Sequence, residues 1–187
     1  MKFWKYLLAG FAFGTVAVAA DFDLASKMIN RETNGSWYFV PDKPKPKHMK
    51  ADVFGDYAFR VKARKGNNPW DMQASSPIAG AIHEGDVVMV IYYARAEVPA
   101  EGGSSLTLRL QQNSPPWTSV LDTTNRISEK WERYCAVGAA TATLAENKGS
   151  VSIHLATADQ TIDLGAVLVF NFGKDFDAKS LAATCNG

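Results

Sequence analysis

Three things are scarce in this sequence: net charge, cysteine, and long apolar runs beyond the first twenty residues. The 187 residues carry 20 Lys and Arg against 19 Asp and Glu, a formal charge of +1. Proteins that neutralise a phosphate backbone need an excess of cations, so nucleic acid is not an expected partner. No stretch after residue 20 approaches the roughly 20 apolar residues that a transmembrane helix needs.

Recognisable catalytic motifs are also missing. The sequence contains no G-x-S-x-G elbow, no H-E-x-x-H, no phosphate-binding loop and no G-x-G-x-x-G. A polysaccharide lyase or hydrolase could still use two carboxylates. The candidates for such a pair are Asp71, Glu97, Asp122 and Asp163. An isolated acid is more often solvated or a cap, so we favour a non-catalytic protein and keep the enzyme as the alternative.

The N-terminus has the composition of a signal peptide. Lys2 and Lys5 precede an apolar run over residues 6–20, which ends in small residues and is followed by Asp21. A transmembrane anchor is the other interpretation, but this run is shorter than a bilayer requires. We expect cleavage at residue 19 or 20. The mature chain is then one domain over residues 21–187, secreted or periplasmic, without membrane contact.

The two cysteines, Cys135 and Cys185, both lie in the expected mature chain. Export to an oxidising compartment favours a disulfide between them, which would fasten the C-terminus. Two unpaired thiols are the alternative. No C-x-x-C spacing indicates a zinc or redox site.

The hydrophobic pattern has a period of two almost throughout. Apolar and polar residues alternate over residues 57–64, 106–111 and 151–156, as in strands with one polar face. Residues 87–94 and 166–170 are apolar at both parities and fit strands covered on both sides. With residues 37–40, 72–74 and 131–137 this makes eight or nine strands, whereas helical periodicity is confined to residues 24–30 and 177–183. The sequence predicts an all-β antiparallel sandwich of jelly-roll type.

Four stretches carry a resemblance to a known group. They are Asn67-Asn68-Pro69-Trp70-Asp71-Met72-Gln73-Ala74, residues 85–96, Trp131-Glu132-Arg133-Tyr134 and residues 161–173. In this order they resemble strands of the family 4/9/22-like carbohydrate-binding modules. Tyr92-Tyr93 stands where Phe-Trp is common in that group, and the cysteine pair is extra.

The resemblance implies a galactose-binding-like jelly roll that binds a plant or algal polysaccharide or oligosaccharide, with no required cofactor. Members usually accompany a catalytic domain, so a separate glycan-degrading enzyme is an implied partner. Modules of this kind often hold a structural Ca²⁺ through oxygen ligands. The nearest acids and amides in this sequence are Glu32, Asn34 and Asp163.

The residues themselves also indicate a binding face. If Leu106, Leu108 and Leu110 point into the core, Arg109 and Gln111 share the opposite face. Aromatic rings stack on the C–H faces of sugars, and Arg and Gln pair with hydroxyls in fixed geometry. Solvated cations and core aromatics are the competing interpretation. The predicted ligand-binding residues are Trp70, Gln73, Tyr93, Arg95, Arg109, Gln111 and Trp117.

Basic residues at outward positions suggest the charge of the ligand. Arg60, Lys62, Arg64, Arg95 and Arg109 alternate with apolar residues, and we expect them to gather on one face. Such a face would favour carboxylate- or sulfate-bearing glycans. A secreted protein-interaction module is the third hypothesis for this polar surface.

Overall fold

The computed structural model describes residues 23–30, 37–43 and 45–185. The predicted signal peptide lies outside these residues, as do Glu32 and Asn34, so the predictions for them are untested. No helix in the described ranges is long and apolar enough to cross a membrane.

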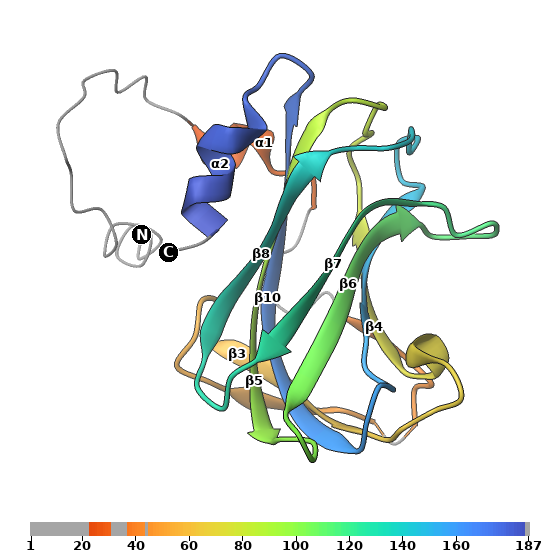
Figure 1. The fold of residues 1–187 in the computed structure, drawn as a ribbon, viewed down its shortest axis with the longest axis vertical. Coiled ribbons are helices and arrows are strands. Elements are labelled where there is room, and N and C mark those ends of the chain that lie inside the picture. The colour runs from red at the N-terminus through yellow and green to blue at the C-terminus, as the bar shows by residue number, and fades with distance from the viewer. Residues whose placement is uncertain (1–22, 31–36, 44, 186–187) are drawn as a thin grey trace, which may run out of the picture.

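Two five-stranded antiparallel sheets pack face to face, which confirms the predicted all-β sandwich (Figure 1). We call the first the β6 sheet, with strand order β1-β4-β9-β6-β7, and the second the β10 sheet, with order β2-β3-β10-β5-β8. The strands of the β6 sheet are β1 (Tyr38–Val40), β4 (Gln73–Ile78), β9 (Gly149–His154), β6 (Ser104–Gln112) and β7 (Ser119–Ile127). Those of the β10 sheet are β2 (Lys47–Lys50), β3 (Tyr57–Ala63), β10 (Gln160–Gly173), β5 (Val87–Val98) and β8 (Glu132–Ala139). The helices are α1 (Leu24–Lys27), the short 3₁₀ helix η1 (Pro69–Asp71) and α2 (Ala178–Cys185).

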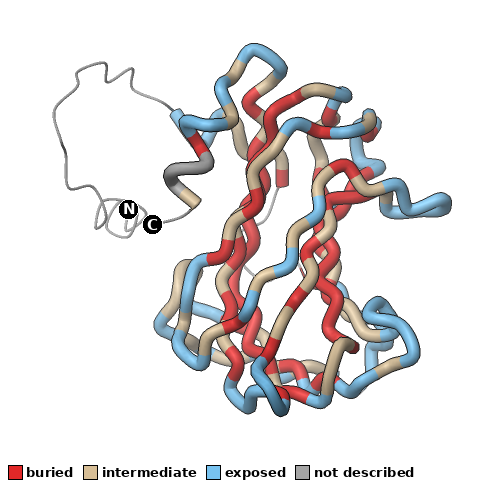
Figure 2. Tube along the Cα trace, viewed as in Figure 1, coloured by how far each residue is buried: buried red, intermediate tan, exposed pale blue. Residues whose placement is uncertain are grey.

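The main core lies between the two sheets. Alternation in β6 turns Leu106, Leu108 and Leu110 inward, where they are completely buried, and the β10 sheet contributes Tyr92 and Ile162. Figure 2 shows buried residues along the strands and exposed residues mostly in the loops. Because the inward positions take the apolar side chains, the opposite parity of each strand is left to face outward.

A second, smaller core covers part of the outer face of the β10 sheet. Met89, Leu168 and Phe170 point outward from β5 and β10 and pack with Leu181 of α2 and Met28 beside α1. Because both faces of these strands are covered, residues 87–94 and 166–170 carry apolar side chains on both sides, as the sequence suggested.

The disulfide between Cys135 of β8 and Cys185 of α2 is present, as predicted, with the two Cα atoms 5.2 Å apart. It joins residues 50 positions apart and holds α2 against the β10 sheet. The C-terminal helix is therefore fixed over the small core, on the side of the sandwich away from the β6 sheet's outer face.

Candidate functional site

The outer face of the β6 sheet carries polar side chains in rows that cross the strands. Direct pairing of residues on neighbouring antiparallel strands places their side chains side by side on one face. One row runs through Tyr38, Ser75, Ser152, Arg109 and Asp122. The adjacent row runs through Val40, Gln73, His154, Thr107 and Thr124.

The corresponding face of the β10 sheet is largely occupied by the protein itself. The small core with α1 and α2 covers one end, and Phe54 stacks on Tyr93 with ring centroids 5.7 Å apart. Beyond Tyr93, Asp163 and Glu97 bind Arg60 and Arg95 in a network of ion pairs. Within the described residues, much of the outer face of the β10 sheet is thus covered by the protein's own side chains or used in ion pairs.

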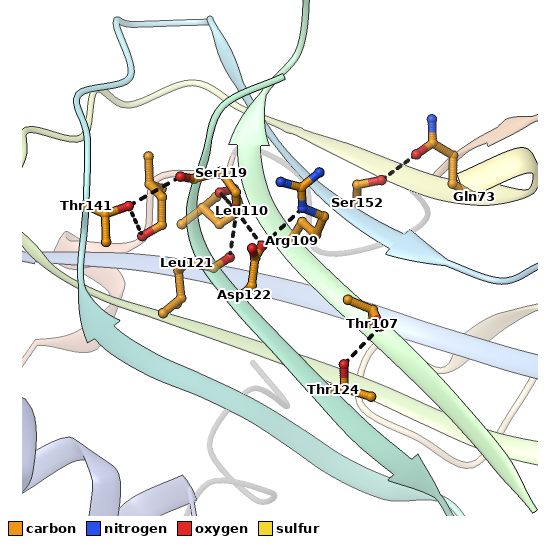
Figure 3. A network of polar contacts seen from close by, with 11 residues as sticks. Gln73, Thr107, Arg109, Leu110, Ser119, Leu121, Asp122, Thr124, Thr141 and Ser152 are labelled. Carbon is orange, nitrogen blue, oxygen red and sulfur yellow. Dashed lines mark hydrogen bonds and ion pairs between the residues drawn. The ribbon is translucent and has the colours of Figure 1, made fainter. Parts of the chain in front are cut away.

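Hydrogen bonds orient the polar groups of this face (Figure 3). The Nε atom of Arg109 donates to Asp122 at 3.2 Å, and the Ser119 hydroxyl bonds to the same carboxylate oxygen. The Ser152 hydroxyl donates to Oε1 of Gln73 at 2.7 Å. Over the part of the chain that the structure describes, the terminal nitrogens of Arg109 and the amide nitrogen of Gln73 make no hydrogen bond. They are oriented donors available to a ligand.

Trp70 lies on a short turn just before β4, beside the row that contains Gln73 and His154. The backbone N–H of Asn68 donates to the Asp71 carboxylate at 2.9 Å, and this bond is the main reason why the pKa of Asp71 is lowered. Pro69 occupies the first position of η1, where its missing N–H costs nothing. The sequence Asn-Pro-Trp-Asp therefore builds a turn that leaves Trp70 53% exposed.

His154 packs against the ring of Trp70. Its ring meets the Trp70 ring edge-on, with centroids 6.0 Å apart, although His154 itself is only 5% exposed. Burial lowers the pKa of His154, the positive charge of Arg109 lowers it further, and Asp122 opposes the shift. The imidazole is therefore neutral at neutral pH.

This burial predicts a pH-dependent stability. Above the ordinary histidine pKa of 6.5, His154 is neutral in both the folded and the unfolded chain. As the pH falls below 6.5, the unfolded chain binds a proton at this histidine more readily than the folded chain does. The free energy of unfolding therefore decreases as the pH falls. Urea unfolding at pH 7.5 and at lower pH should show a smaller decline for His154→Gln than for the wild type. An identical decline in both proteins would contradict the assignment.

Trp117 lies in the loop between β6 and β7, close to the start of β7 at Ser119. Its backbone has φ of 58°, an uncommon conformation for a bulky residue, and its N–H donates to the carbonyl of Ser114 at 2.9 Å. The residue is 47% exposed. Gln111 shares the outer parity of β6 but is 6% exposed, and its side-chain oxygen has no hydrogen-bond partner in the described part of the chain. Trp117 is therefore accessible, whereas Gln111 lies beneath the surface.

Several solved carbohydrate-binding modules share this fold. A family 4 module superposes with a TM-score of 0.51 at 17% identity, covering 78% of this chain and 95% of the module. The N-terminal cellulose-binding domain of Cellulomonas fimi β-1,4-glucanase C gives 0.54 at 18% identity, covering 74% and 91%. The chain has the fold of a carbohydrate-binding module. The family 22 xylan-binding domain of Paenibacillus barcinonensis Xyn10C also superposes, with a TM-score of 0.50 at 11% identity over 78% of this chain and 91% of that domain.

Sequence comparison adds nothing to this fold assignment. No protein-family model matches the chain, and no curated protein matches its sequence.

On the carbohydrate-binding-module fold, the predicted ligand-binding residues separate into two groups. Gln73 and Arg109 lie on the outer face of the β6 sheet with Trp70 and Trp117 near its ends. Tyr93 and Arg95 lie on β5, which pairs with β10 and β8 and not with β6. The expectation that all these side chains share one face is wrong, because chain order does not determine which strands are neighbours.

Tyr38 is the main residue that the sequence analysis missed. It alternates with buried Trp37 on β1 and is 67% exposed at the edge of the β6 sheet, in the row of Arg109. Ser152 and His154 were also missed. The alternation of apolar and polar residues in β1 and β9 indicates which side chains point outward. Only the pairing of β1 with β4 and of β9 with β6 places these residues near Arg109.

The predicted metal ligand Asp163 has a different role. It is completely buried, and its two carboxylate oxygens accept hydrogen bonds of 2.7 to 2.9 Å from Arg60 and Arg95. No group of three His, Cys, Asp or Glu suited to a metal occurs among the described residues. Because arginines occupy both oxygens, Asp163 does not fit a Ca²⁺ site.

The carboxylates that could form a catalytic pair are also separated. Asp71 caps η1, Asp122 binds Arg109, and Glu97 and Asp163 are bridged by arginines on the β10 sheet. Of these four acids, Asp122 alone lies on the outer face of the β6 sheet.

The predicted gathering of five cations on one face is wrong for Arg109 alone, since the other four lie together on the opposite sheet. Arg60 and Lys62 lie on β3, Arg64 follows it, and Arg95 lies on β5, so all four belong to the β10 sheet. Arg109 is the one member of the set on the β6 sheet, and Asp122 balances its charge.

Proposed function

We propose that this protein is a secreted, non-catalytic carbohydrate-binding module that binds a polysaccharide on the outer face of the β6 sheet. The observation that carries the proposal is a sheet face whose oriented donors, Arg109 and Gln73, lie between exposed aromatic residues. The fold, shared with solved carbohydrate-binding modules, supports the same role.

The chemistry of this face suits a sugar chain. Exposed Trp70, Tyr38 and Trp117 offer ring faces for stacking against sugar C–H groups. The terminal nitrogens of Arg109 and the amide of Gln73 can donate to hydroxyls, while Thr107 and Thr124, hydrogen-bonded at 2.9 Å, offer hydroxyl groups of their own. Donors held by other hydrogen bonds lose little conformational freedom when a ligand binds.

The ligand we infer is neutral. The only ion pair on the outer face of the β6 sheet, within the described residues, is Arg109 with Asp122, which adds no net charge. A uronate or sulfate group would gain from Arg109 but meet the Asp122 carboxylate beside it. A neutral hydroxyl can use both groups, as donor to one and acceptor from the other.

Affinity electrophoresis against neutral β-glucan and xylan tests the proposal. We expect retention that changes little between low salt and about 0.5 M NaCl, because contacts to neutral hydroxyls are not screened as charge pairs are. Lack of retention on a full panel of neutral polysaccharides would overturn the proposal. Release of reducing ends or unsaturated products from those polymers would instead favour the alternative, a glycan-active enzyme.

Export of the mature chain and partnership with a separate glycan-degrading enzyme remain predictions of the sequence. N-terminal sequencing of the protein recovered outside the cytoplasm tests the first, with cleavage expected after Ala19 or Ala20.

A further inference from the structure

Six cations form what we call the basic strip, along one edge of the β10 sheet. They are Lys43, Lys45, Lys47, Lys62, Arg64 and Lys65. All six are exposed, and none of their side chains makes an ion pair or hydrogen bond with the described residues.

Arginines elsewhere in the described structure are paired. Arg60 and Arg95 bind Asp163, Arg109 binds Asp122, and Arg126 donates to the carbonyl of Gly102. Among the described residues, lysines such as Lys130 and Lys179 are also exposed and unpaired, so the basic strip is distinguished by the gathering of its cations on neighbouring segments, in a chain whose formal charge is only +1.

The strand register places part of the strip on neighbouring segments. Lys62 follows Arg60 on the outer parity of β3, and the antiparallel register sets Lys47 of β2 opposite Arg60. The segment leading into β2 accordingly runs toward the Lys62 end of β3. Lys45 precedes Pro46, which favours extended backbone at Lys45.

A depression accompanies the strip. It has a volume of about 480 Å³ and is lined by Lys62 and Arg64 together with Val98, Asp159 and Thr161. It brings together two cations, a hydroxyl group and the Asp159 carboxylate, which accepts a hydrogen bond from the backbone N–H of Lys65 at 3.0 Å.

Protection of a sheet edge does not account for these cations. Lysines on an edge strand such as β2 discourage pairing with another chain. Lys62, however, lies on β3, an inner strand between β2 and β10, and pairs with Thr161. The charge thus extends from the edge onto the face of the sheet.

We propose that the basic strip is a second binding site, which takes a linear polysaccharide bearing carboxylates or sulfates. Several exposed cations on neighbouring segments match repeated anionic groups on a polysaccharide chain, and Arg64 can pair with such a group bidentately. A membrane surface fits less well, because Val98 is the one large exposed apolar residue lining the depression. The site lies on the other sheet from the neutral-glycan face and does not depend on it.

The test is affinity electrophoresis in gels containing polygalacturonate. The strip variant is Lys45→Gln, Lys62→Gln, Arg64→Gln, and the matched control is Lys130→Gln, Lys174→Gln, Lys179→Gln, which removes the same charge from exposed positions elsewhere. We expect the dissociation constant of the wild type to rise about tenfold when salt shortens the screening length from about 10 Å to about 3 Å. The strip variant should lose most of the retention at low salt, and the control variant should keep it.

Three results would overturn the proposal: no retention of the wild type on polygalacturonate, equal retention of the two variants, or binding to phosphatidylglycerol vesicles without binding to polygalacturonate. Retention of both variants on neutral β-glucan is measured in parallel. Because that binding uses the other sheet, failure of the second site and failure of the neutral-glycan proposal are separable.

Discussion

The double variant Trp70→Ala, Tyr38→Ala should bind neutral polysaccharide about a hundredfold more weakly than the wild type. A stacked aromatic ring contributes up to about 1.5 kcal/mol beyond its buried area, and each 1.4 kcal/mol changes a dissociation constant tenfold. The two rings lie on opposite sides of the row that contains Gln73, so their losses should add. Isothermal titration with a soluble neutral oligosaccharide measures the effect.

Tyr57→Ala is the matched control. Tyr57 is also exposed and aromatic, but it lies on β3 of the β10 sheet, stacked on His48. Its removal should leave neutral-glycan affinity unchanged. Because Trp70 and Tyr38 are more than half exposed, the double variant should keep the melting temperature of the wild type within a few degrees. Equal losses of affinity in the control and the double variant would contradict the proposed face.

Asp163→Asn should destabilise the fold by about 3 kcal/mol, at the low end of what is lost when one partner of a buried ion pair is removed. Asp163 is completely buried, whereas Arg60 and Arg95 are roughly one-quarter exposed and can regain some hydration. Without the carboxylate, two arginines face each other across β10 with Glu97 as their remaining acid. Urea unfolding should show the loss, while neutral-glycan affinity of the folded variant stays unchanged.

Glu97→Gln is the control for Asp163. Glu97 binds the same two arginines, at 2.9 and 2.7 Å, but its side chain is 31% exposed. Ion pairs at such partly exposed positions contribute up to about 1 kcal/mol. A loss in Glu97→Gln as large as that in Asp163→Asn would show that burial is not the cause. A gain in stability of the wild type with Ca²⁺, absent in Asp163→Asn, would restore the metal interpretation.

The sequence shows which side chains of each strand point inward and which point outward. It does not show which strands are neighbours in a sheet. Leucines at alternate positions of β6 require Arg109 to face outward, and the structure agrees. Tyr93 also has an outward parity, yet it lies on the other sheet, because β5 pairs with β10 across a sequence separation of about seventy residues. Local periodicity carries no information about such long-range pairing.

The lack of information about strand pairing also explains why Arg109 was expected on the same face as the other cations. Arg60 and Arg109 have equivalent patterns around them, and only the order of strands assigns one to the β10 sheet and the other to the β6 sheet. Trp70 was easier to identify, since its turn is built by adjacent residues, Asn68 and Asp71. The disulfide was predictable because only two cysteines exist to pair.

The most direct test of the central claim is an NMR titration with a neutral hexasaccharide of β-glucan or xylan. The side-chain N–H signals of Trp70, Gln73 and Arg109 report on the outer face of the β6 sheet, and the backbone amides of β3 and β5 report on the β10 sheet. We predict saturable shifts in the first group, together with Tyr38, and none in the second. Shifts confined to β3 and β5, or no shifts with any neutral hexasaccharide, would contradict the account.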